Sequence, residues 1–221
     1  MSDFVTARHN MVDGQIRPSS VTDWRIIDAM RSVPREAFVS ESQRALAYLD
    51  IDIEVGGNGA VKQYLIQPVV TARLLHAAEI TSSDHVLVVG SATGYVAALA
   101  AKLAGRVTAS VSDAATAAQA TAILDGLGFG NITVRTAPAA AGCPEDAPFD
   151  VIILNGATEI VPTNLYQQLK MGGRLVGVFA MQRPQRAKIV TRSAGDFGDR
   201  VLFETSLPVL PELQRMPAFV F

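Results

Sequence analysis

The sequence predicts an α/β protein in which helices cover both faces of a mostly parallel sheet. From residue 85 onward, short apolar segments alternate with Ala-rich or amphipathic segments of helical length, and this alternation is typical of parallel strands joined by helices. Several of the strand-like segments, such as residues 85–89, are almost wholly apolar, as expected for a sheet buried on both faces. Residues before this region show helical spacing, and the last segments read as strands. We therefore expect an N-terminal helical layer and antiparallel strands at a C-terminal edge.

The first clear helix is predicted between residue 20 and the proline at position 34. Trp24, Ile27 and Met30 are spaced to share one face. Either Ser20 or Thr22 can serve as the N-cap, because a short side-chain oxygen accepts a hydrogen bond from the free N–H groups at a helix start. We expect Trp24 to be buried together with Ile27 and Met30.

Residues 40–68 contain a second helical stretch and then a glycine-rich break. In the stretch SESQRALAYL, Leu46 and Leu49 are spaced to face the core. Three glycines between residues 51 and 68 predict a strand-like piece and a loop. An amphipathic helix is expected to begin at Pro68, since proline is favoured in the first helical turn.

The alternation that follows defines the central elements. Strands are predicted at 85–89, 106–111, 131–136, 149–154 and 173–180, and helices at 95–104, 114–128 and 161–170. Further strands are expected at 187–195, 200–210 and 218–221, with a polar turn around Gly195 to Gly198. Parallel connections of this kind are right-handed, so a ligand crevice is expected beyond the carboxyl ends of the strands.

Length and charge favour one domain without a polyanionic partner. The chain has 221 residues, a mass of 23.5 kDa and a formal net charge of -2, whereas nucleic acid or an anionic membrane calls for a basic face. Cys143 is the one cysteine, which fits a reducing compartment. We expect a cytoplasmic protein with a helical cap over 1–83, a core over 84–180 and C-terminal strands over 181–221.

The segment VVGSATGYVAALAA resembles a cofactor-binding turn. Gly90 and Gly94 stand between an apolar strand and an Ala-rich helix, where nucleotide-binding folds place a glycine-rich turn. His9, His76 and His85 are scattered without metal-ligand spacing, so no metal site is predicted. Asp113 follows the turn by about the spacing of a dinucleotide fingerprint, which keeps a dinucleotide-dependent oxidoreductase open as a less favoured alternative.

The strand and turn VLVVGSATGY resemble the VLEIGTGSGY pattern of class I S-adenosylmethionine methyltransferases. Other segments, in the same order along nearly the whole chain, are similar to motifs of the protein-L-isoaspartate O-methyltransferase family: NMVDGQIRP to RMVEQQLRP, VPREAFV to VPRELFVP, LAYLDIDI to LAYEDRPL, APFDVIIL to APFDAIIV, and LYQQLKMGGRLV to LLEQLKPGGRLV. The ending LPVLPELQRMPAFVF is closer to a bacterial side branch called isoaspartyl methyltransferase-like.

The resemblance implies a Rossmann-like class I methyltransferase domain. It also implies methyl transfer from S-adenosylmethionine to the carboxylate of damaged aspartyl residues in a protein or peptide partner. The residues expected to contact this cofactor are Gly90, Ser91, Gly94, Tyr95, Ala139 and Asn155, with Asp113 as the nearby acid that could accept from the ribose.

Several positions depart from the family pattern. Val88 replaces the first-strand acid, Ala92 the middle glycine of the turn, and Val111 the ribose-binding acid. The adenine-recognising acid aligns with Pro138, and the serine of the family's TISQP turn aligns with Ile66. No catalytic residue is therefore assigned. An active carboxyl methyltransferase and a degenerate, methyltransferase-like binding or regulatory protein both remain open.

The remaining candidates have structural alternatives. Asp113 is either a substitute ribose acceptor or the N-cap of the helix that follows. Ser91 either contacts a ligand or forms the turn. Tyr95 either covers a cofactor or begins the buried face of its helix, and Asn155 either faces the reacting group or forms an Asn-Gly turn with Gly156.

Overall fold

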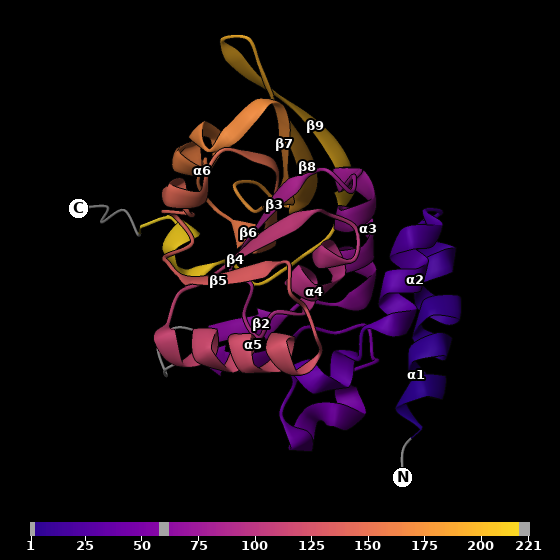
Figure 1. The fold of residues 1–221 in the computed structure, drawn as a ribbon. Helices are drawn as coiled ribbons and strands as arrows, with labels where there is room; N and C mark the ends of the chain where they lie inside the picture. Colours follow the sequence, from indigo (N-terminus) through magenta and orange to yellow (C-terminus); the bar gives the residue numbers. More distant parts are fainter. Residues whose placement is uncertain (1–2, 58–61, 217–221) are drawn as a thin grey trace, which may run out of the picture.

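The computed structural model describes residues 3–57 and 62–216. Within them, a seven-stranded sheet in the order β5-β4-β3-β6-β7-β8-β9 forms the centre of the molecule (Figure 1). The strands from β3 to β7 pair in parallel, and the hairpin of β8 and β9 continues the sheet antiparallel. The predicted fold class is thereby confirmed. The strand bounds are β3 His85–Val89, β4 Arg106–Val111, β5 Ile132–Thr136, β6 Phe149–Thr158, β7 Leu169–Phe179, β8 Arg186–Ser193 and β9 Asp196–Glu204.

Helices cover both faces of this sheet unequally. Three helices pack on one face: α3 (Pro68–Ala78), α4 (Tyr95–Ala101) and α5 (Ala114–Gly126). The short α6 (Thr163–Gln167) packs on the other. The strands are buried on both sides because alternate residues enter two cores: Val86 and Val88 face the larger, and Leu87 and Val89 the smaller.

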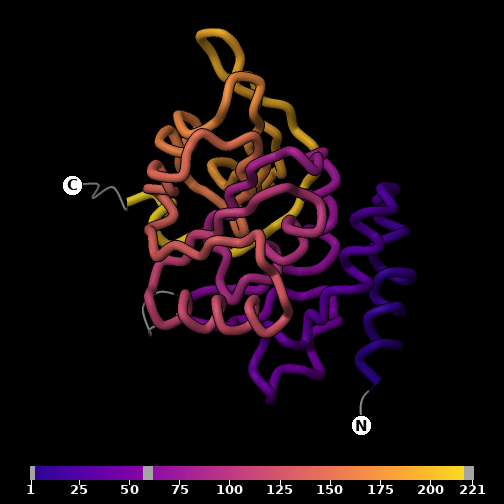
Figure 2. Tube along the Cα trace, viewed as in Figure 1, coloured from indigo at the N-terminus to yellow at the C-terminus, as the bar shows by residue number. Residues whose placement is uncertain are grey.

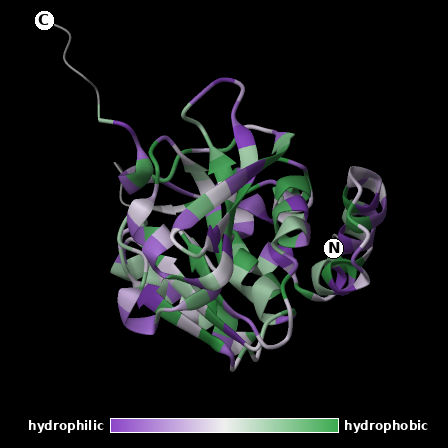
Figure 3. Ribbon diagram, turned by 90° about the horizontal axis from the view of Figure 1, so that it is seen from above, coloured by the Kyte–Doolittle hydropathy of each residue, from purple (hydrophilic) through white to green (hydrophobic). Residues whose placement is uncertain are grey.

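The N-terminal part forms a helical layer beside α3 (Figures 1 and 2). It contains α1 (Phe4–Met11), a π turn (Val12–Ile16), α2 (Trp24–Ser32) and short 3₁₀ turns at Arg17–Ser19, Arg35–Phe38 and Glu41–Leu46. A two-stranded antiparallel sheet of β1 (Ile53–Gly57) and β2 (Lys62–Leu65) then leads into α3. Viewed from above, α1 and α2 stand as a pair at one side of the sheet (Figure 3).

Two predictions about the N-terminal part are wrong. Trp24 is 73% exposed, because the buried face of α2 is formed by Ile26, Ile27, Ala29 and Met30, and Trp24 lies nearly opposite the centre of that face. The N-cap is Asp23, which accepts from the backbone N–H of Arg25, rather than Ser20 or Thr22.

The second predicted helix is also shorter and tighter than expected. Its residues form 3₁₀ turns, and Leu46 and Leu49 are exposed rather than packed in the core. Three residues per turn do not sustain the helical spacing on which the prediction relied. The predicted helix over 161–170 is reduced to α6, while β6 runs four residues beyond its predicted end.

The strand predicted at 200–210 ends early. β9 stops at Glu204, and the chain then leaves the sheet. Pro208 and Pro211 have no N–H to give to a strand ladder, which explains the break. The strand predicted at 218–221 lies outside the described residues. None of the helices in the described parts of the chain has the length and apolar character needed to cross a membrane.

Candidate functional site

The predicted turn lies at the carboxyl end of β3. Gly90 and Gly94 have φ values of +67° and +101°, a left-handed conformation that glycine adopts without steric cost. Ala92 shares this conformation with φ +50°, which costs a residue with a Cβ roughly 1–2 kcal/mol. The Ser91 N–H donates to Ser110 O at 2.8 Å, tying the turn to β4. The turn therefore keeps the backbone shape of a glycine-rich turn despite the alanine.

Asn155, near the carboxyl end of β6, stands beside this turn. Its Nδ2 donates to Gly90 O at 2.7 Å and to Tyr64 O at 3.2 Å. Asn155 therefore connects β6, the turn after β3 and the β2 strand. Its Oδ1 is buried and accepts no hydrogen bond from any described residue. The same is true of Gln63 Oε1, and both residues line one small cavity.

A C-terminal strap, residues 206–213, crosses this crevice. Val209 forms a parallel bridge with Ala157. The Ala157 N–H donates to Pro208 O at 2.8 Å, and the Leu210 N–H donates to Ala157 O at 2.9 Å. At the far end, the Glu159 N–H donates to Leu213 O at 2.9 Å. The strap thus runs along the end of β6 as an added extended segment.

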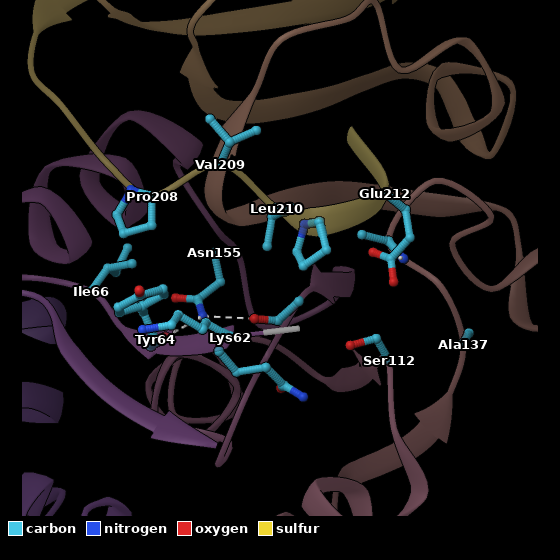
Figure 4. Close-up of a pocket in the computed structure, with 14 residues that line it drawn as sticks. Lys62, Tyr64, Ile66, Ser112, Ala137, Asn155, Pro208, Val209, Leu210 and Glu212 are labelled. Atoms are coloured by element: carbon cyan, nitrogen blue, oxygen red, sulfur yellow. Dashed lines mark hydrogen bonds between the residues drawn. The ribbon is translucent and has the colours of Figure 1, made fainter. Parts of the chain in front are cut away.

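Leu210 occupies the space directly over the turn. Its side chain provides the nearest atoms to the position that a Cβ would take on Gly90, and a Cβ on Gly156 would lie 2.9 Å from Leu210 Cγ. Figure 4 places Leu210 beside Asn155, with Glu212 on the side of Ser112 and Ala137. The volume left in the cavity is about 20 Å³, enough for about one water molecule.

The structure brings three of the seven predicted cofactor-binding residues to this cavity: Gly90, Ala139 and Asn155. Ser91 is buried in the turn without lining it. Gly94 packs against Leu124 of α5.

Tyr95 is fully buried on the side of the N-terminal layer. Its ring meets Phe38 edge-on at 5.4 Å and lies under the Arg35 guanidinium at 4.8 Å. It does not line the cavity. Of the two alternatives for Tyr95, the structure shows the buried start of a helix.

Asp113 caps α5. Its Oδ1 accepts from the Thr116 N–H at 2.8 Å, and its Oδ2 accepts from the side-chain amide of Gln63. Both carboxylate oxygens are thus engaged by the protein, and Asp113 does not line the cavity. At the ribose position itself, Val111 is fully buried at the end of β4 and has no side-chain oxygen that could accept a hydrogen bond.

The turn before α3 is held by a buried arginine and a half-buried aspartate that were not singled out from the sequence. Arg35 is fully buried and donates to Ala47 O and Ile66 O, each at 2.7 Å. Asp52 accepts from the Gln67 N–H at 2.9 Å, and burial raises the pKa of this carboxyl. Gln67 also reaches the strap, donating to Ser206 O at 3.4 Å. Arg35 lies in the VPREAFV segment. The similarity of this segment to a family motif was a signal for Arg35, but it indicated no chemical role.

Cys143 has no catalytic surroundings. Its side chain is buried, and burial raises the pKa of the thiol to about 11. It is therefore protonated at neutral pH and is not a nucleophile.

The fold and the glycine-rich turn define a class I methyltransferase domain. Among solved structures, a protein-L-isoaspartate O-methyltransferase superposes with a TM-score of 0.80 at 24% identity, over 91% of this chain and 65% of that one. A putative protein-L-isoaspartate O-methyltransferase from Plasmodium falciparum, solved with S-adenosyl-L-homocysteine, gives 0.77 at 16% identity, over 93% of this chain and 98% of that one.

Sequence comparison identifies the family. The model of the protein-L-isoaspartate(D-aspartate) O-methyltransferase family matches residues 6–206. A protein-L-isoaspartate O-methyltransferase 1 of Rhodopseudomonas palustris (strain HaA2) is 38% identical over 88% of this chain and 78% of its own length. One of Koribacter versatilis is 37% identical over 88% and 86%. The chain belongs to the protein-L-isoaspartate(D-aspartate) O-methyltransferase family, so the resemblance noted in the sequence is confirmed.

Proposed function

We propose that this chain is a protein carboxyl methyltransferase of the isoaspartyl type whose affinity for S-adenosylmethionine is low. Family membership and the class I fold support the reaction and the cofactor. The acceptor would be the carboxylate of a damaged aspartyl residue in a protein or peptide. Such a carboxylate is already ionised, so the transfer depends mainly on positioning rather than on an acid or base. The replacement of the family's serine by Ile66 is compatible with that requirement.

The observation that carries the proposal is the turn of Gly90 and Gly94 beside Asn155. The turn keeps its left-handed backbone, and Asn155 fixes it against β6. Asn155 Oδ1 and Gln63 Oε1, buried without a donor among residues 3–57 and 62–216, are acceptors suited to hydroxyl or amino groups of an adenosyl ligand. They support a polar ligand at this end of the sheet.

In this conformation, however, the residues present do not accommodate the cofactor. The cavity of about 20 Å³ holds no more than a water molecule or so, and Leu210 stands where the turn would meet a ligand. Val111 cannot accept hydrogen bonds from a ribose. At roughly 1.5–3 kcal/mol per hydrogen bond to a charged acceptor, losing two costs about 3–6 kcal/mol. That weakens binding by roughly two to four powers of ten.

Calorimetric titration with S-adenosylmethionine and S-adenosylhomocysteine tests the proposal, together with a methylation assay on an isoaspartyl peptide. The matched control is the same peptide with a normal aspartyl residue. We expect a dissociation constant near the millimolar range and slow transfer to the isoaspartyl peptide alone. Absence of both binding and transfer at millimolar cofactor would overturn the proposal.

A second candidate is a binding or regulatory protein that uses the methyltransferase fold without catalysis. The observation that favours it is the clustering of Val88, Val111 and Pro138, which replace family acids around one crevice. On this reading Leu210 fills a site that no longer takes a cofactor. Binding of S-adenosylhomocysteine to a Leu210→Ala variant distinguishes the two candidates, because a crevice that has lost its cofactor site does not bind this ligand even when Leu210 is removed.

A further inference from the structure

We propose that the C-terminal strap is an intramolecular competitor for the cofactor crevice, so that an S-adenosyl ligand enters only when the strap leaves. This inference rests on the proposed function, because it requires that the crevice still takes such a ligand. It assigns a regulatory role to residues 206–213, none of which was predicted to bind the cofactor.

The strap is anchored by buried leucines, of which Leu210 reaches the crevice. Its sequence, SLPVLPEL, places Leu207, Leu210 and Leu213 at every third residue. Leu210 has φ -63° and ψ 132°, near the polyproline conformation, which has three residues per turn. All three leucines are buried, while the residues between them are not. Leu207 packs in the larger core and Leu210 and Leu213 in the smaller one, and of the three it is Leu210 that lines the cavity. The two prolines also lower the entropy that an extended segment loses on docking.

The strap contacts the positions at which a cofactor is expected. Leu210 covers Gly90 and Gly156. The Glu212 carboxylate accepts from the Ala139 N–H at 3.3 Å, next to Pro138, where the family pattern recognises adenine. Apolar and polar parts of the strap thus stand in for two different parts of one ligand. A ligand that needs these contacts cannot bind while the strap makes them.

The strap is attached by noncovalent contacts that can open and close. It begins after β9 and has no strand partner except the single bridge of Val209 with Ala157 in the described part of the chain. Backbone hydrogen bonds of this kind each have a modest net effect on stability, because water replaces them when they open. Leaving the crevice exposes the three leucines, which opposes opening, and ligand binding can offset that cost.

The experiment compares S-adenosylhomocysteine binding by calorimetry to the full chain, to Leu210→Ala/Glu212→Ala, and to Leu165→Ala. Leu165 is fully buried in the same smaller core and does not line the cavity, so it controls for a general loss of packing. We expect the strap variant to bind at least about tenfold tighter than the unaltered chain, and Leu165→Ala not to gain affinity.

Hydrogen exchange gives a second readout on the unaltered chain. With saturating S-adenosylhomocysteine, the amides of Leu210 and Glu159, which bond the strap to the end of β6, should exchange faster if the strap is displaced. Equal or weaker binding by the strap variant, or slower exchange at these amides, overturns the competitor role and leaves the proposed function standing. No binding by any of the three proteins overturns both proposals.

Discussion

The two sides of the crevice differ in the chemistry that they keep. On the side of β3 and β6, the amide of Asn155 holds the turn at Gly90, and the buried Arg35 holds the backbone at Ala47 and Ile66. On the side of β4 and β5, Val111 and Pro138 stand where the family has acids, and Glu212 of the strap accepts from the Ala139 N–H. One family acid is also replaced on β3, at Val88. Groups that also hold the fold together are present, whereas groups that would serve only a ligand are replaced.

The comparison predicts that the retained side is essential for stability. Arg35→Ala should lower the free energy of unfolding by about 3–6 kcal/mol, because two buried carbonyl groups lose a charged donor. Urea denaturation followed by fluorescence measures this. Arg44→Ala, at an exposed position of the same N-terminal part, should change it by less than about 0.5 kcal/mol. A loss below 1 kcal/mol for Arg35→Ala would mean that water or rearrangement replaces these bonds.

The contact between the turn and the strap is the next test. Gly90→Ala should cost about 2–5 kcal/mol, since it adds left-handed strain and a clash with Leu210. Leu210→Ala alone should cost about 2 kcal/mol. In the double variant the clash is removed, so the total should be smaller than the sum by at least about 1 kcal/mol. Additive losses in urea denaturation would show that the two residues do not compete for space.

The difference between the two sides also explains what sequence reasoning could reach. The alternation of apolar and helical segments was sufficient for the sheet, because a strand such as His85–Val89 is buried on both faces and is wholly apolar after its first residue. The turn at Gly90 was equally visible, since its glycines follow a strand directly. By contrast, the sequence around Leu46 has the apolar spacing of an α-helix but forms 3₁₀ turns, so the exposure of Leu46 was not predictable.

The docking of residues 206–213 as a strap is not predictable from the sequence, for a different reason. Residues 200–210 are apolar enough to resemble a strand, and only the prolines at 208 and 211 mark the change to an extended segment with a period of three. Where that segment docks depends on the space between Gly90 and Gly156, which no local pattern encodes.

The role of Asp113 was ambiguous because an aspartate at the start of a helix can either cap the helix or bind a ligand.

Asp113 separates structural from ligand-binding roles on the replaced side. Asp113→Ala should cost about 1–2 kcal/mol of stability through loss of the cap on α5. It should leave the affinity of the Leu210→Ala/Glu212→Ala variant for S-adenosylhomocysteine unchanged, because the carboxylate is held by Thr116 and Gln63. Asp125→Ala, an exposed change on the same helix, is the control for stability. A tenfold loss of affinity would instead assign Asp113 to the ligand.

The smallest expected effect lies at the opposite end of the sheet, away from the crevice. His85 is buried at the start of β3, where its ring contacts Thr108 at 3.1 Å and Arg106 at 2.8 Å. Burial, followed by the charge of Arg106, lowers the pKa of His85. Between that lowered pKa and the unfolded value near 6.5, the unfolded chain binds more protons than the folded one, so stability rises with pH in this window. Stability from His85 is therefore present above about pH 6.5 and is lost as the pH falls.

From pH 7.5 to 5.5 the unaltered chain should lose more stability than His85→Gln, by no more than about 1.4 kcal/mol. Asp52, whose pKa is raised by burial, acts in the opposite direction just above pH 3.8 and is common to both proteins, so the difference in urea midpoints isolates His85. Equal midpoint shifts would mean that the folded protein tolerates a charged imidazole at this position.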